Sequence, residues 1–305
     1  MDGGNDRTET VAELGEDRLI ERLVAGLPTG GNVVVGPGDD CAVIDTGAER
    51  HLLLKTDCLI EAVHFARGTD AHLVGEKAMK RVVSDIAAMG GTPKHALVTL
   101  ALNDSRSVDE VSGWYAGMAA VAASFDCVVV GGETSRLPGE GAVISIAMTG
   151  EVLPEHCVLR SGARRGDLIL VSGRLGGSFE SGRHLRFTPR IREAQWLVSN
   201  HRPSAMMDLS DGLGSDLPRL AQASGEGYTV SPDRLPCHEG VSTQEAVSDG
   251  EDYELLFTIA PEKTGMLMVA WANAFPEVAL TIIGEVTEDT PLELSRGWEH
   301  FKTNE

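Results

Sequence analysis

The stretch His51-Leu52-Leu53-Leu54-Lys55-Thr56-Asp57 decides the fold, because an apolar run there is followed within three residues by a carboxylate. A short apolar run of this kind predicts a buried strand over residues 51–56. We expect a helix of about twenty residues to follow, with its N-cap at Thr69 or Asp70 and its end at Gly90-Gly91. Another strand is predicted over residues 95–102. A strand, a long helix and a second strand indicate helices packed on a sheet.

The rest of the chain mixes strands and helices in each of two halves, without strict alternation. We therefore predict an α+β or α/β fold of two domains with mixed sheets. Residues 1–16 are assigned to a flexible lead-in, 17–155 to an N-terminal domain and 156–305 to a C-terminal domain, with the polar segment 160–167 near the boundary. The further predicted strands cover residues 33–35, 41–44, 127–130, 142–151, 168–172, 253–259 and 280–286, with one more near Tyr228. The further predicted helices cover residues 17–27, 107–125, 190–199, 213–224 and 261–273, and Ser107-x-x-Glu110 predicts a capping box for the second of them.

The charge of the chain limits its partners. The formal net charge is −20, from 46 acidic and 26 basic side chains. This field repels nucleic acid and anionic membrane surfaces, so we expect neither as a partner. No apolar run approaches the ~20 residues that span a bilayer. Five cysteines without a C-x-x-C pair, together with an acidic N-terminal segment, indicate a reducing cytoplasm.

Acidic residues recur where predicted strands end or helices begin. They are Asp39 and Asp40, Asp57, Glu133, Asp208 and Asp211, with Asp85 on the long helix. Two carboxylates ~4 Å apart repel by on the order of 4 kcal/mol at an effective dielectric near 20, so cations must hold them if they converge. Oxygen ligands without a His or Cys set favour Mg²⁺, which substrate phosphates usually complete. The acids therefore predict several Mg²⁺ ions and a nucleotide or phosphate ligand.

Each acid on its own has a simpler interpretation, since Asp and Gly-Asp pairs are common in solvated turns. The sequence contains neither a G-x-x-x-x-G-K-[ST] loop nor the H-R-D and D-F-G motifs of protein kinases. The Gly-rich segment 173–178 suits a tight connection as well as a phosphate cradle. Composition does not identify the site, and the order of the motifs has to do so.

Seven motifs carry a resemblance to the thiamine-monophosphate kinase family. That family belongs to the ATP-binding superfamily that includes aminoimidazole ribonucleotide synthetase and selenophosphate synthetase. The likeness covers about residues 14–302, and the motifs lie in the family's order. They are Gly38-Asp39-Asp40-Cys41-Ala42, Thr56-Asp57 with Val63-His64-Phe65, Ser84-Asp85-Ile86, Gly131-Gly132-Glu133-Thr134, Arg160-Ser161-Gly162, Asp208-Leu209-Ser210-Asp211-Gly212 and Gly250-Glu251-Asp252-Tyr253-Glu254.

The resemblance implies a fold and a reaction. An N-terminal domain would join a partner's strands in a dimeric barrel, beside a C-terminal α+β domain. ATP and thiamine phosphate would give thiamine diphosphate and ADP, with several Mg²⁺ ions and without a general base, assisted by Arg160. The implied metal ligands are Asp39, Thr56, Asp57, Asp85, Glu133, Asp208 and Asp211. The implied nucleotide contacts are Tyr115, Gly132, Glu133, Arg160 and Ser210, and the implied contacts to thiamine phosphate are His64, Glu251 and Trp298.

Three positions depart from the family pattern. Glu133 stands where Asp is usual and is longer by one methylene, although Mg²⁺ geometry is strict. Lys55 replaces a small hydroxyl residue, and Asp249 replaces Gly. Our hypothesis is that the Lys55 ammonium substitutes for one peripheral metal ion. Two alternatives stay open: a superfamily relative such as an ATP-dependent synthetase or ligase with another substrate, and a non-catalytic nucleotide-binding regulator.

Overall fold

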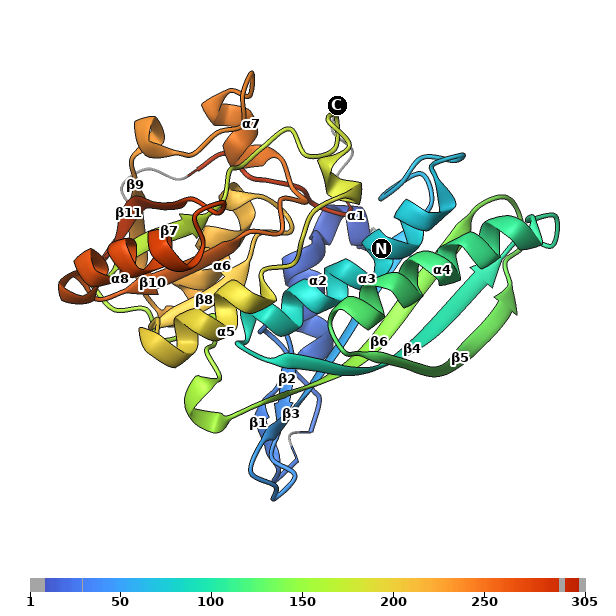
Figure 1. Cartoon of the computed structure of the whole chain (residues 1–305), viewed down its shortest axis with the longest axis horizontal. Helices are drawn as coiled ribbons and strands as arrows, with labels where there is room; N and C mark the ends of the chain where they lie inside the picture. The colour runs from blue at the N-terminus through green and yellow to red at the C-terminus, as the bar shows by residue number, and fades with distance from the viewer. Residues whose placement is uncertain (1–8, 29, 291–293, 302–305) are drawn as a thin grey trace, which may run out of the picture.

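The computed structural model describes residues 9–28, 30–290 and 294–301, and over these ranges the chain forms a six-stranded and a five-stranded sheet with helices around them (Figure 1). The first sheet has the order β1 (Val33–Val35), β2 (Ala42–Ile44), β3 (His51–Ile60), β6 (Ala142–Val152), β4 (Thr92–Leu102) and β5 (Val128–Arg136). Its neighbours are antiparallel except for the parallel pair β4–β5. The second sheet is antiparallel, in the order β8 (Ala205–Asp208), β10 (Leu255–Ile259), β7 (Leu168–Ser172), β11 (Leu280–Thr287) and β9 (Gly227–Val230).

Helix α3 (Ala71–Ala88) lies in the middle of the molecule, between the two sheets (Figure 1). It packs on β3 and β6 of the first sheet, on α4 (Val108–Ser124), and on β8 and α5 (Ile191–Asn200) of the second half. The remaining helices are α1 (Val11–Leu14), α2 (Glu16–Val24), α6 (Leu213–Ser224), α7 (Thr243–Ser248) and α8 (Pro261–Ala274), with 3₁₀ turns at Pro154–His156, Arg183–Leu185 and Pro232–Arg234. None of the helices in the described ranges has both the length and the apolar character needed to cross a bilayer.

Two apolar clusters form the core. One runs from the first sheet through α3 and α4 to α8, and the other lies between the second sheet and α6. Neighbouring residues of β7 face different clusters, since Leu170 belongs to the first cluster and Ile169 to the second. Both faces of the second sheet are therefore covered, which is why β8 and β10 are buried along their whole length.

Most predicted elements are present, with shifted ends. The predicted strand 51–56 continues to Ile60, because Asp57 and Cys58 pair with β6. Strand β8 was not predicted, since Ala205-Met206-Met207 is short and lacks the β-branched residues that mark strands. Of the predicted lead-in, residues 1–8 lie outside the described residues, whereas Val11–Leu14 form α1 with a capping box from Thr10.

The capping box predicted at Ser107 was wrong. Ser107 is the N-cap of α4, but its side chain makes no capping hydrogen bond. The Glu110 carboxylate instead accepts a hydrogen bond from Arg106 at 2.7 Å, and Arg106 also pairs with the buried Glu61. A nearby guanidinium thus competes successfully for the carboxylate, because a charge-assisted hydrogen bond is stronger than one from a neutral amide.

Close packing of α3 against α4 depends on glycine and gives a test of the fold. A Cβ on Gly75 would lie 1.9 Å from the Trp114 carbonyl oxygen, so Gly75→Ala should destabilise the protein by about 1–3 kcal/mol. Gly265→Ala on α8 is the matched control, because a Cβ there meets no atom within 4 Å. Helix propensity predicts that this control raises the stability by up to about 1 kcal/mol. Urea unfolding followed by circular dichroism measures both, and equal stability of the two variants would contradict the packing.

Candidate functional site

Three buried carboxylates from the two halves of the chain converge. Asp40 precedes β2, Asp85 lies on α3 and Asp208 ends β8, and their nearest oxygens all lie within 4.8 Å of one another. Burial raises the pKa of Asp85 well above its usual range and that of Asp208 to about 6, with Asp40 adding to the second shift. Asp85 and Asp208, two of the acids noted in the sequence, thus lie close together, and Asp40 from the first acidic motif joins them.

Fixed donors compensate part of this charge. The Lys55 ammonium lies 2.6 Å from Asp85, and the Arg160 guanidinium donates to Asp40 at 2.5 Å. The Ser84 hydroxyl donates to Asp208 at 2.5 Å. One oxygen, Asp40 Oδ2, is buried without a hydrogen-bond partner among the described residues. A buried carboxylate oxygen without a donor is costly, and a divalent cation would satisfy it, so an all-oxygen set of this kind fits Mg²⁺.

The other predicted metal ligands lie outside this three-acid cluster. Asp39 accepts hydrogen bonds from the backbone of Arg160 and Asp40, and its pKa is raised to about 6 by burial and by Asp40. Asp57 pairs with Arg81 at 3.0 Å, and Asp211 with Arg219 at 2.5 Å.

Thr56 and Glu133 are exposed, unlike the three clustered acids. Thr56 follows Lys55 on β3, and alternation along the strand directs it to the opposite face of the sheet from Lys55 and Asp57. Glu133 lies on the edge strand β5 and accepts a hydrogen bond from the Ser135 hydroxyl. Neither side chain joins the three-acid cluster in the single chain.

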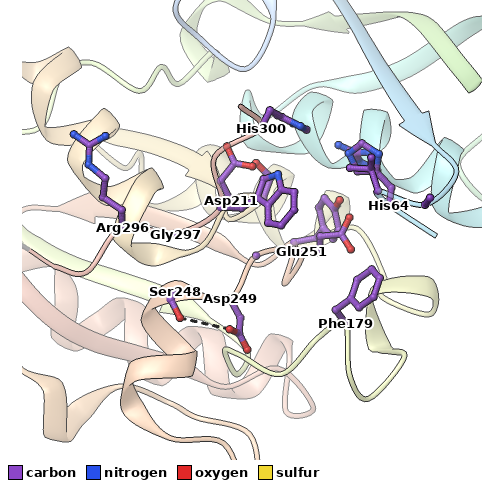
Figure 2. Close-up of a pocket in the computed structure, with 16 residues that line it drawn as sticks. His64, Phe179, Asp211, Ser248, Asp249, Glu251, Arg296, Gly297 and His300 are labelled. Carbon is purple, nitrogen blue, oxygen red and sulfur yellow. Dashed lines mark hydrogen bonds between the residues drawn. The ribbon is translucent and has the colours of Figure 1, made fainter. Parts of the chain in front are cut away.

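A cavity of about 580 Å³ lies between the two halves of the chain (Figure 2). The predicted contacts His64, Glu251 and Trp298 all line it. Ser210 and Asp211 line it as well, so the end of β8 carries Asp208 to the acid cluster and the following loop reaches the cavity. The structure thus brings these five residues together from widely separated segments.

Lys77 on α3 organises one wall of the cavity. Its side chain is completely buried, and its ammonium donates to the His64 carbonyl at 2.6 Å and to Glu251 at 2.7 Å. The ammonium also lies 2.7 Å from His184 Nδ1. Burial would raise the pKa of Glu251, but hydrogen bonds from His184 and Lys77 outweigh it and lower the pKa to about 2. Glu251 therefore presents a carboxylate to the cavity at neutral pH.

The His64 ring is neutral and fixed in orientation. Its Nδ1 accepts a hydrogen bond from the Ile60 amide at 3.0 Å, which leaves the proton on Nε2. Burial, with the neighbouring Arg81 charge, lowers the pKa of His64 to about 4. The ring of His300 lies 5.7 Å away, so the C-terminal segment approaches the same wall, as Figure 2 shows.

Backbone contacts place Trp298 at the cavity. The Trp298 amide donates to the Asp211 carbonyl at 2.9 Å, and the Gly297 amide donates to the Ser215 hydroxyl at 3.0 Å. A Cβ on Gly297 would lie 2.0 Å from the Asp211 carbonyl oxygen, so the segment needs glycine to approach this closely. The indole is about two-fifths exposed, and its face remains available to an aromatic ligand.

The predicted nucleotide contacts separate into two groups. Arg160 and Ser210 adjoin the acid cluster and the cavity, respectively. Tyr115 lies on α4 in another hollow with Leu102 and Val111, and Gly132 lies on the exposed edge strand β5. These two do not reach the cavity within one chain.

The ligand assignments made from sequence omitted Asp40, Lys77 and Arg81, although Asp40 stood among the acids of the first motif. Lys77, Arg81 and Asp85 recur every four residues along α3 and therefore share a helix face. That spacing could have predicted their position, because a helix face that directs Asp85 toward the site also directs Lys77 and Arg81 toward it. No such signal separated Asp40 from Asp39, since only the turn decides which of two adjacent acids points inward.

Comparison with known proteins identifies the fold family. Residues 38–152 match the N-terminal domain, and residues 164–296 the C-terminal domain, of AIR synthase related proteins. The thiamine-monophosphate kinase of Rhodopirellula baltica is 36% identical over 89% of this chain and 88% of its own length. That of Aquifex aeolicus is 35% identical over 95% of this chain and 99% of its own.

Solved structures agree with this relationship. AaThiL complexed with AMPPCP and TMP has a TM-score of 0.83 at 34% identity and covers 96% of this chain and 99% of its own. The hydrogenase maturation protein HypE of E. coli has a TM-score of 0.70 at 19% identity, with 92% of this chain and 98% of its own covered, and shares the fold alone. With a third of its residues identical to these kinases along nearly its whole length, the chain belongs to the thiamine-monophosphate kinase family of AIR synthase related proteins.

Proposed function

We propose that the chain transfers a phosphoryl group from ATP to thiamine phosphate, giving thiamine diphosphate and ADP. One observation carries this proposal: the cavity lined by His64, Glu251 and Trp298 adjoins the buried acid cluster. Arg81 connects them, because it lines the cavity and pairs with Asp57, which follows Lys55 and Thr56 on β3. Family membership and the related AaThiL complex with AMPPCP and TMP support the same reaction.

The chemistry needs two anions brought together rather than a base. The acceptor phosphate has a second pKa of about 6 and is largely a dianion at neutral pH. In-line transfer then depends on positioning and on neutralising charge. Arg160 supplies a fixed cation beside Asp40, and the Glu251 carboxylate and the Trp298 face suit a cationic thiazolium ring.

We assign Mg²⁺ to the acid cluster, with Asp40, Asp85 and Asp208 as the residues that would hold it. When bound, Mg²⁺ supplies neutralisation of the phosphate oxygens. Asp57, whose charge acts on Asp85, and Asp211, three residues after Asp208, would be further ligands once they exchange their arginine partners. We propose Asp39, Thr56 and Glu133 as metal ligands only in an assembly of more than one chain, where their surroundings would differ from those in the single chain.

A homodimer suits the exposed face of the first sheet. Helices α3 and α4 cover one face, whereas Leu54, Leu97, Val128 and Val130 on the strands remain exposed (Figure 1). We propose that a second copy covers these residues in a barrel and brings Tyr115, Gly132 and Glu133 to the nucleotide.

We also propose the two-domain division at residues 155 and 156, since the first sheet ends at Val152 and the second begins at Leu168. The five free cysteines suit a cytoplasmic location.

An activity assay separates the kinase from its alternatives. With ATP and Mg²⁺, we expect ADP to form only when thiamine phosphate is present, and thiamine diphosphate to form in equal amount. Turnover with another acceptor instead would indicate a synthetase-like relative. Nucleotide binding without any turnover would indicate a regulator, and either outcome would refute the proposal.

Asp40 and Asp39 form a matched pair for testing the metal ligand. Asp40→Asn removes a charge from the buried cluster and should lower kcat/KM by roughly 10²–10³ and weaken Mg²⁺ binding. Asp39→Asn removes the same charge next to the cluster and should cost less than about tenfold. Circular dichroism checks that both variants fold. A large loss in Asp39→Asn with near-normal Asp40→Asn would reverse the assignment.

Lys55 tests whether a side-chain cation occupies one metal position. Its ammonium lies 2.6 Å from Asp85, and Asp85 and Asp57 raise its pKa although burial opposes them. Lys55→Ser should therefore bind one additional Mn²⁺ per chain in the presence of AMPPCP, as counted by equilibrium dialysis. Lys80→Ser is the control, because Lys80 pairs with Glu76 away from the cluster. Equal numbers of bound Mn²⁺ per chain in wild type and both variants would refute the hypothesis that Lys55 replaces a metal ion.

A further inference from the structure

A second cavity, of about 250 Å³, lies on the other side of the segment that carries Glu251. Side chains alternate along residues 249–254: Asp249, Glu251 and Tyr253 line the substrate cavity, whereas Asp252 and Glu254 line the second one. The second cavity contains none of the residues that we assign to thiamine phosphate, nucleotide or metal binding. We call it the arginine cavity.

Three arginines in this cavity form no ion pair with an acid over residues 9–28, 30–290 and 294–301. Arg174, Arg183 and Arg186 donate only to backbone carbonyls, of Cys237, Gly176 and Gly182, and form no ion pair within the described ranges. Arg183 Nε is buried and has no hydrogen-bond partner among the described residues. Positive charge without partners is unexpected in a chain with a net charge of −20. A buried, unsatisfied N–H calls for an acceptor.

The two acids of the arginine cavity do not supply that acceptor. Glu254 is already occupied by Arg190 and by the Ser172 hydroxyl at 2.5 Å. Asp252 accepts the Gly176 amide at 2.9 Å and forms no hydrogen bond with the three arginines in the described ranges, and burial raises its pKa to about 8 although the nearby Arg183 charge opposes the shift. Neither group therefore cancels the charge of the three arginines.

We propose that the arginine cavity is a second ligand site, which binds a small phosphate-type anion through Arg174, Arg183 and Arg186. Planar guanidinium groups bind phosphate oxygens in pairs, and several of them can surround one anion. The volume limits the ligand to a compact species such as inorganic phosphate or pyrophosphate, rather than a nucleotide. This site is separate from the phosphate of the substrate, because the 249–254 segment lies between the two cavities.

Calorimetric titration with pyrophosphate in metal-free buffer at constant ionic strength tests the site. Wild type should bind one pyrophosphate per chain, and Arg186→Gln should weaken the binding by about tenfold or more, since a charge-assisted contact is lost. Arg186 is exposed, so its replacement should leave the melting temperature and the kinase activity unchanged. Arg192→Gln is the control of equal charge change, because Arg192 is exposed on α5 outside the cavity.

Two results would overturn the proposal. Equal affinities in wild type, Arg186→Gln and Arg192→Gln would mean that the anion does not use the arginine cavity. Pyrophosphate binding that thiamine phosphate displaces, and that Arg186→Gln leaves intact, would place the anion in the substrate cavity. Binding that survives saturating thiamine phosphate and is lost in Arg186→Gln supports the second site, whatever the outcome of the activity assay.

Discussion

Burial of three carboxylates at one point is the constraint on which the site depends. Asp40, Asp85 and Asp208 come from a loop, a helix and a strand end, so their approach requires both halves of the chain to be folded. Lys55 and Arg160 offset part of the repulsion, and Asp40 Oδ2 accepts no hydrogen bond from the part of the chain that the structure describes. The folded cluster therefore carries uncompensated negative charge. Metal ions can neutralise it, and they can bind a phosphate-bearing substrate at the same time.

Helix α3 transmits this constraint to the substrate cavity. Its one face carries Lys77 toward Glu251, Arg81 toward Asp57 and Asp85 toward the acid cluster. Glycine at position 75 lets α4 press against the helix from the other side. A rigid helix thus sets the distance between the cavity and the cluster, which suits in-line transfer, where small misplacements of the reacting groups are expensive.

Several positive charges of this acidic chain lie at the acid cluster and at the two cavities. Arg160 and Lys55 adjoin the cluster, and Arg81 lines the substrate cavity. The arginine cavity follows the same rule on the reverse side of the 249–254 segment. A strongly negative surface with local positive hollows admits selected anions and rejects polyanions such as nucleic acid.

The sequence by itself determined the type of most elements, the motif order and, through resemblance, the family and its reaction. Capping and glycine signals were sufficient for α3 and a short apolar run for β7, but local signals did not predict β8 and were wrong for the cap at Ser107. Tertiary structure alone decided that Asp40 rather than its neighbour joins the cluster, and that Lys77 contacts Glu251 across 174 residues of sequence. The physical reason is that adjacent side chains differ in direction, which local pattern leaves open, and that a buried lysine is tolerated only where distant acceptors meet it.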